Sequence, residues 1–150
     1  DRNFAINHYR TVTGIDHQTG LTQFTVMSVD CSADRLFYLL AVNDLSVDFI
    51  NISPEKYVFN LNREHSLVAK TVLSEAGIPV SIVEDCVKVS IVGAGIMGTP
   101  GITAKMVGAL MREKIEILQT TDSYTTIWVL VHGKDLKRAV NVLHETFLGE

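Results

Sequence analysis

Hydrophobic positions along the chain alternate between strand-like and helix-like spacing. Short β-rich apolar runs predict strands at residues 12–15, 23–29, 47–52, 56–61 and 80–83. Residues 32–45 and 65–77 carry apolar side chains at helical spacing, and the second of these runs ends in Gly77, a typical C-terminal cap residue. From residue 23 onward, the predicted order is therefore strand, helix, two strands, helix, strand.

The same order begins again near residue 87. Strands are predicted at 87–92, 116–120 and 126–131, with a turn at 122–124, and helices at 102–113 and 134–147. Val47 lies 68 residues before Ile115, its counterpart in the second copy, which indicates an internal repeat. The second copy has no strand after its last helix. We expect the run at 12–15 to fill that slot, because a vacant slot would expose a sheet edge.

These elements predict an α+β fold of two ferredoxin-like βαββαβ units. Each unit is expected to have an antiparallel four-stranded sheet with helices on one face. The first unit is predicted at residues 23–85, as an insertion within a discontinuous second unit made of residues 11–18 and 86–150.

Composition and charge narrow the classes of partner. The net charge is −4, with no block of like charge, so nucleic acid and anionic membranes are poor partners. No apolar run approaches the roughly 18 residues of a membrane span. The two cysteines and five histidines lack metal-ligand spacing, so we expect no metal site, and cysteine usage favours a cytoplasmic location.

Gly93, Gly95 and Gly98 have the spacing of the G-x-G-x-x-G dinucleotide fingerprint. Pro100 delays the following helix, however, and the residues after 120 are too few for a doubly wound parallel sheet. The loop is better interpreted as exposed N–H groups at a helix N-terminus, which suit a carboxylate as well as a phosphate. A dinucleotide-binding oxidoreductase fragment and a dimerisation module without a ligand remain the alternatives.

Several segments resemble one known family: V-G-A-G and P-G-I-T-A-K-M in the loop and helix, then I-L-Q-T-T-D-S, W-V-L-V and A-V-N-V-L-H-E-T-F. Together they are similar to the C-terminal regulatory half of aspartokinase, with its paired ACT domains, of the monofunctional type in the lysine and diaminopimelate pathway. The lead T-V-T-G-I at 11–15 resembles the segment that joins the family's kinase domain to this half. The resemblance implies that residues 1–10 are a linker from a kinase domain absent from this sequence.

The resemblance also implies a function. A small amino-acid effector, namely lysine, diaminopimelate or threonine, is expected to bind between ACT domains and to mediate feedback inhibition. A homodimer through ACT domains is implied, with the kinase domain or a catalytic subunit of aspartokinase as a further partner. No catalytic residue and no cofactor are expected in this chain, since the absent kinase domain binds ATP and Mg. The effector-binding positions that the resemblance implies are Asp30, Asp48, Phe49, Gly95, Thr99, Pro100, Gly101, Ile102, Glu116 and Ile117.

Among these positions, the two copies place an acid at equivalent points, Asp48 and Glu116. The loop N–H groups can take the α-carboxylate of an effector, and an acid opposite them can hold a cationic amine. On this hypothesis Glu116 favours lysine or diaminopimelate over threonine. Strand alternation leaves open that both acids simply face water.

Overall fold

The structure is a computed structural model that describes residues 12–149. The expected linker at 1–10 lies outside the described residues. The described chain divides into two compact units: unit 1 holds the residues up to Thr19 and from Val87 onward, and unit 2 holds Gly20–Cys86. Two strands, β1 (Gly14–Met27) and β4 (Ser81–Val92), run through both units.

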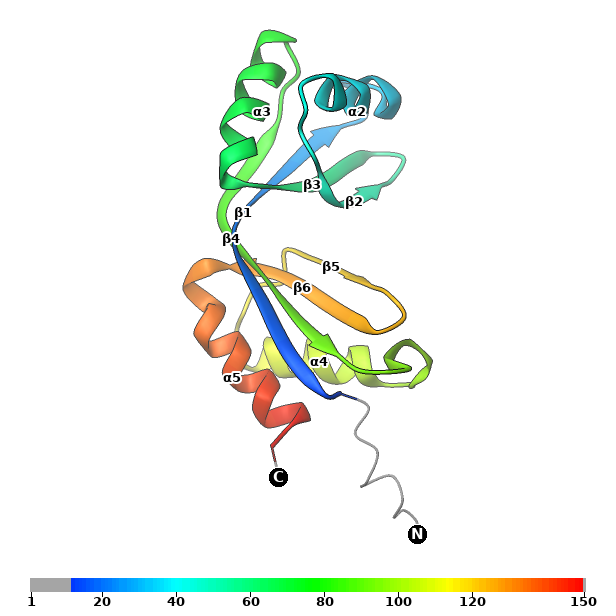
Figure 1. The fold of residues 1–150 in the computed structure, drawn as a ribbon, viewed down its shortest axis with the longest axis vertical. Helices are drawn as coiled ribbons and strands as arrows, with labels where there is room; N and C mark the ends of the chain where they lie inside the picture. The colour runs from blue at the N-terminus through cyan, green and yellow to red at the C-terminus, as the bar shows by residue number, and fades with distance from the viewer. Residues whose placement is uncertain (1–11, 150) are drawn as a thin grey trace. The chain divides into compact units, whose positions relative to one another are not determined.

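Unit 2 combines the second part of β1 and the first part of β4 with four elements of its own. These are α2 (Ala33–Val42), β2 (Asp48–Ile52), β3 (Lys56–Asn62) and α3 (Arg63–Glu75). Its strand order is β2-β3-β1-β4, and β1 pairs antiparallel with β3 from Leu21 opposite Asn62 to Met27 opposite Lys56. Both helices cover one face of the sheet (Figure 1).

The core of unit 2 lies between these helices and that sheet face. Alternate positions of β1 and β3 send Phe24, Val26 and Phe59 inward, where they meet Leu36 of α2 and Leu73 of α3. Side-chain direction repeats every 2 residues along a strand and every 3.6 residues along a helix. Apolar residues at these spacings therefore form one buried side of each element.

Unit 1 contains the first part of β1, the second part of β4 and the remainder of the chain. After β4 come a 3₁₀ turn η1 (Ile96–Gly98), α4 (Ile102–Arg112), β5 (Gln119–Asp122), β6 (Thr126–His132), a second 3₁₀ turn η2 (Gly133–Asp135) and α5 (Leu136–Phe147). The strand order is β1-β4-β6-β5, so the N-terminal strand occupies the edge slot beside β4. The Thr13 N–H donates to the Val92 carbonyl at 2.7 Å there.

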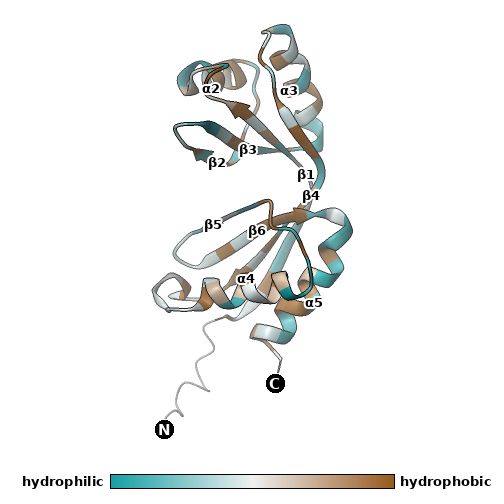
Figure 2. Cartoon of the chain, turned by 180° about the vertical axis from the view of Figure 1, so that it is seen from behind, coloured by the Kyte–Doolittle hydropathy of each residue, from teal (hydrophilic) through white to brown (hydrophobic). Residues whose placement is uncertain are grey.

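The core of unit 1 is separate from that of unit 2. It packs Val89 and Ile91 of β4 and Val129 of β6 against Leu110 of α4 and Leu143 of α5. Figure 2 shows apolar and polar residues on different sides of α5, as expected for a helix that buries one stripe. Each unit is therefore a ferredoxin-like α+β layer pair, as the sequence predicts.

Strand boundaries differ from the sequence prediction in two places. The runs 12–15 and 23–29 are joined in the single strand β1, which begins at Gly14 and ends at Met27. The runs 80–83 and 87–92 are joined in the single strand β4, which begins at Ser81. The prediction broke these strands at polar stretches. Both strands continue through these stretches, where the side chains Asp16–Gln18 in β1 and Glu84 and Asp85 in β4 are exposed to water.

Candidate functional site

The glycine loop between β4 and α4 is fixed by its own backbone hydrogen bonds. Gly95 and Gly101 have φ of 69° and 84°, in the left-handed region that glycine adopts readily. The Thr99 hydroxyl donates to the Gly95 carbonyl at 3.2 Å. The Gly93 N–H donates to the Thr125 carbonyl at 2.8 Å, which ties the loop to the β5–β6 hairpin. The loop is thus anchored at the end of the sheet where β6 begins.

The N-terminus of α4 follows this loop directly, and its backbone N–H groups are available to a ligand. Its N-cap is Gly101, which offers no side-chain cap, and the first turn contains no acidic residue. The first helical hydrogen bond runs from the Lys105 N–H to the Gly101 carbonyl at 2.9 Å, so the N–H groups of 102–104 lie outside the helix's own bonding. These groups and the helix dipole make a positive site for an anion.

A pocket of about 270 Å³ lies beside this helix end. The β5–β6 register sets Thr121 opposite Trp128 and Asp122 opposite Ile127. The pocket joins this end of β5 to Thr103 in the first turn of α4. The Thr120 hydroxyl donates to the Trp128 carbonyl at 2.8 Å. The residues that line the pocket are Thr103, Thr120, Thr121, Asp122 and Ile127.

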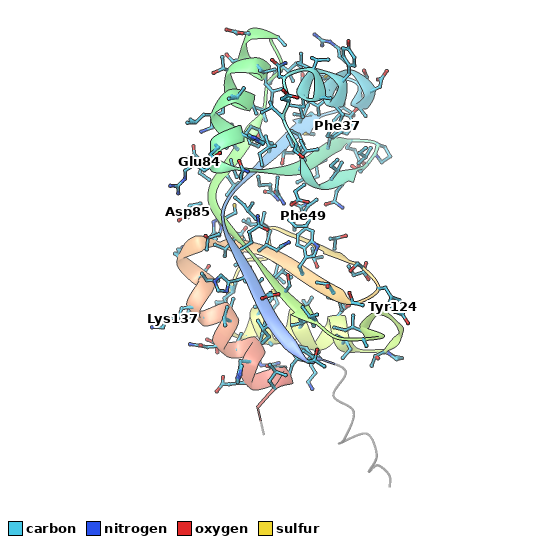
Figure 3. All side chains as sticks on the ribbon, viewed as in Figure 1. Phe37, Phe49, Glu84, Asp85, Tyr124 and Lys137 are labelled. Carbon is cyan, nitrogen blue, oxygen red and sulfur yellow. The ribbon has the colours of Figure 1, made fainter. Side chains whose placement is uncertain are left out.

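Asp122 gives the pocket a charge opposite to that of the helix end. Its side chain is exposed and makes no hydrogen bond or ion pair with any residue of the described chain. Tyr124 follows at the tip of the hairpin, close to the glycine loop and with an exposed ring (Figure 3). A carboxylate at the helix end and an ammonium at Asp122 would satisfy both charges, which is the charge pattern of a free amino acid.

Five of the expected site residues lie together in this loop and the first residue of α4: Gly95, Thr99, Pro100, Gly101 and Ile102. Thr103, Thr121 and Asp122 were missed by the sequence interpretation, which took Asp122 as part of a turn. For Thr121 and Asp122, the signal was the cluster of hydroxyl and acidic residues T-T-D-S at the end of β5 and the start of the hairpin turn.

Glu116 lies at the other end of the sheet. The predicted strand opening at Glu116 is wrong: β5 begins at Gln119, because the chain after α4 turns through Lys114 at φ 59° and buries Ile115 before pairing starts. The Glu116 Oε1 lies 2.9 Å from His132 Nε2, at the end of β6. From Thr125, which contacts the glycine loop, to His132 is seven strand steps, or roughly 23 Å.

Within unit 1, Glu116 therefore does not face the loop N–H groups, and its expected role in a site between two ACT domains stays a prediction. Ile117, like Glu116, precedes β5 in the sequence. It is half-buried and packs against the core of unit 1.

The expected positions in unit 2 have different surroundings. Asp30 is exposed in the turn before α2, and its N–H donates to the Met27 carbonyl at 3.0 Å. Asp48 is exposed at the start of β2, and Phe49 follows at a register shift in β2, with φ 53°.

The helix end in unit 2 already carries an acid. Asp34 lies in the first turn of α2, and a hydrogen bond with the Ser32 side chain, helped by backbone N–H groups, lowers the pKa of its carboxyl below the usual value. The negative side chain occupies the positive helix end that a ligand carboxylate would use. This difference favours the N-terminus of α4 in unit 1 over the N-terminus of α2 in unit 2 as the place for an anionic group.

Replacing Gly101 by alanine tests whether the loop needs its left-handed residue. A Cβ there meets no atom within 4 Å, so the penalty comes from φ alone and should be about 1–2 kcal/mol of unfolding free energy. Gly98→Ala is the matched control, since that position also has open space but no positive φ, and its loss should stay below about 0.5 kcal/mol. Urea unfolding of both variants measures the difference, and equal losses would contradict this account of the loop.

The described residues give little support to a metal site, a reactive thiol or a membrane-spanning helix. Within 12–149, no group of three or more histidine, cysteine, aspartate or glutamate side chains is placed to hold a metal ion. Burial raises the pKa of the Cys86 thiol to about 11, so this cysteine is a poor nucleophile at neutral pH. No helix in the described part of the chain is long and apolar enough to cross a membrane.

The dinucleotide alternative does not fit the fold. α4 begins at Ile102, after a 3₁₀ turn that ends at Gly98, whereas a Rossmann helix begins within the glycine fingerprint. The strands of unit 1 also follow the ferredoxin-like order rather than that of a doubly wound parallel sheet.

Comparison with known proteins points to one family. The family model for the ACT domain matches residues 81–145. Aspartokinase 1 of Bacillus subtilis (strain 168) is 44% identical over 141 residues, which covers 92% of this chain and 35% of that protein. The chain thus spans about a third of the length of this relative.

Two solved structures match this chain along nearly their whole length. A structure of aspartokinase alpha and beta subunits aligns with a TM-score of 0.84 and 26% identity, covering 91% of this chain and 99% of that one. The regulatory subunit of aspartate kinase from Thermus flavus aligns with a TM-score of 0.78 and 25% identity, again covering 91% and 99%. On its sequence and its fold, this chain belongs to the ACT-domain regulatory portion of the aspartokinase family.

Proposed function

We propose that this chain senses a free amino acid of the aspartate family, namely lysine, diaminopimelate or threonine, and mediates feedback inhibition of aspartokinase. The observation that carries the proposal is the pocket in unit 1, where the uncapped N-terminus of α4 lies beside the unpaired carboxylate of Asp122. An amino acid presents both of the charges that this arrangement lacks.

The kinase domain, or a catalytic subunit, is the proposed recipient of the signal. Membership in the regulatory portion of aspartokinases supports this assignment, because the matched region is about a third of the Bacillus subtilis relative. Phosphoryl transfer from ATP to aspartate would then belong to the part of the enzyme outside this match.

Thermal unfolding with a ligand panel tests the binding class. A cognate amino acid at about 100 times its dissociation constant should stabilise the folded chain by about 2.7 kcal/mol. NAD and ATP should leave the melting temperature unchanged. A shift with NAD and none with lysine, diaminopimelate or threonine would overturn the proposal in favour of a nucleotide site.

The same proposal includes a homodimer, and the edge of the unit 2 sheet supports one contact surface for it. β2 is the last strand in that sheet, and Ile50 and Ile52 on it are 44% and 60% exposed. An exposed apolar edge strand is a template for pairing with another chain, and a second copy supplies the same edge.

Ile52→Lys should therefore shift the chain from dimer toward monomer, because a charge on the edge opposes strand pairing. Val42→Lys is the control, since Val42 is similarly exposed, at 57%, but lies at the end of α2. Light scattering at micromolar concentration measures both. A dimer that survives Ile52→Lys, or that Val42→Lys disrupts equally, would place the contact elsewhere.

A further inference from the structure

Unit 2 contains a pocket of its own at the base of α3. It has a volume of about 250 Å³ and lies between the first turns of α3 and the strands β1 and β4. Its floor includes Gly20 and Thr22 of β1, and its walls carry the charged side chains Arg63, Lys70, Glu84 and Asp85. None of these residues belongs to the site in unit 1.

Two of the four charges neutralise each other. Lys70 Nζ lies 2.8 Å from Glu84 Oε2. The hydrogen bond from Lys70 and the charge of Lys70 lower the pKa of the Glu84 carboxyl, with a smaller contribution from the charge of Arg63. This ion pair lines the pocket and contributes no net charge to it.

The other two charges have no partner. Neither the Arg63 guanidinium nor the Asp85 carboxylate makes a hydrogen bond or an ion pair with any residue in the described part of the chain. They also do not pair with each other, since no nitrogen–oxygen distance of 4.0 Å or less joins them. The pocket therefore presents one positive and one negative group whose nitrogen and oxygen atoms lie more than 4.0 Å apart.

The backbone holds Asp85 in an uncommon conformation. Asp85 has φ 54° within β4, and Gly20, which also lines the pocket, has φ 74° in β1. A left-handed aspartate inside a strand is uncommon, and such outliers cluster at binding sites. Figure 3 places Glu84 and Asp85 together at the base of α3.

We propose that this pocket is a second ligand site, which binds a small zwitterion of the α-amino-acid class through Arg63 and Asp85. The guanidinium of Arg63 takes the ligand carboxylate, and the carboxylate of Asp85 takes the ligand ammonium. A simple anion is a poorer fit, because Asp85 and Glu84 repel it. The volume lies near the lower limit for ligand pockets, roughly 300 Å³, which restricts the ligand to a small molecule.

Backbone amide NMR on the whole chain tests this site. Each proteinogenic α-amino acid is added separately at about 10 mM, enough to populate a site of millimolar affinity. At least one should shift the amide signals of Gly20, Thr22 and Ser66. For that ligand, the analogue without its amino group and the analogue without its carboxylate should both bind at least about tenfold more weakly, since each loses a charge-assisted hydrogen bond.

Arg63→Gln and Asp85→Asn should each weaken this binding at least about tenfold. Both should fold, because Arg63 is exposed and asparagine tolerates the left-handed conformation. Glu75→Gln, at the other end of α3, is the matched control and should bind as the unaltered chain does.

Asp122→Asn separates this site from the one in unit 1, since it should leave the shifts of Gly20, Thr22 and Ser66 intact. The proposal is overturned if no amino acid shifts these amides, if the shifts survive both Arg63→Gln and Asp85→Asn, or if the analogue without the amino group binds equally well. The site in unit 1 could still bind its ligand in each of these cases.

Discussion

Replacing Asp122 by asparagine is expected to weaken binding of the effector amino acid by about 1.5–3 kcal/mol, or roughly 10- to 150-fold. The substitution keeps the shape of the side chain and removes the charge that would hold the ligand ammonium beside the N-terminus of α4. Asp122 is exposed and has no partner in the described chain, so the folded state should keep its stability.

Glu116→Gln is the matched control for this experiment. It also removes one negative charge from unit 1, but Glu116 pairs with His132 at the opposite end of β6, roughly 23 Å from the glycine loop. Calorimetry with lysine, diaminopimelate and threonine should show an unchanged affinity for this variant. An unchanged affinity in Asp122→Asn together with a loss in Glu116→Gln would restore the hypothesis made from the sequence.

The largest expected loss of stability comes from Phe59→Ala. Phe59 is fully buried on β3, stacks on Phe24 with ring centroids 5.4 Å apart, and meets Phe37 of α2 edge-on at 5.6 Å. Removing a buried phenylalanine costs about 3–5 kcal/mol through lost burial and the cavity left behind. That is a large share of the roughly 5–15 kcal/mol that stabilises a typical domain.

Tyr38→Ala is the control for the loss of an aromatic ring in the same unit. Tyr38 is on α2 and is 70% exposed, so its removal should change the unfolding free energy by less than about 0.5 kcal/mol. Urea unfolding measures both variants. A loss below about 1 kcal/mol in Phe59→Ala would contradict a core built around these three rings.

The repeated order of elements was predictable from the sequence because each helix and strand buries one side. Leu36 and Leu40 of α2, and Leu143 of α5, occupy the apolar positions that the helical spacing indicates. The order of strands followed from the repeat and from the need to cover a sheet edge. Periodicity also placed the glycine loop before α4, where Pro100 and Gly101 delay the helix.

The strand ends were not predictable in the same way. β1 and β4 continue through exposed polar residues, where no apolar alternation marks a strand. β5 begins at Gln119 rather than at Glu116, so Glu116 lies before the strand, while Asp122 at its other end lines the pocket beside α4. The unpaired charges of Arg63 and Asp85 depend on contacts between distant segments, which spacing along the chain does not encode.

Mapping the bound effector by backbone amide NMR tests the proposed sensing function most directly. The chain is titrated with lysine, diaminopimelate and threonine in turn, and the amide shifts are assigned along residues 12–149. The account predicts that one of these amino acids shifts Gly101, Ile102 and Thr103 together with Thr121 and Asp122, because the ligand carboxylate and ammonium bind at these two ends of one pocket. Shifts with none of the three amino acids, or shifts of Gly93–Gly98 with NAD alone, would contradict it.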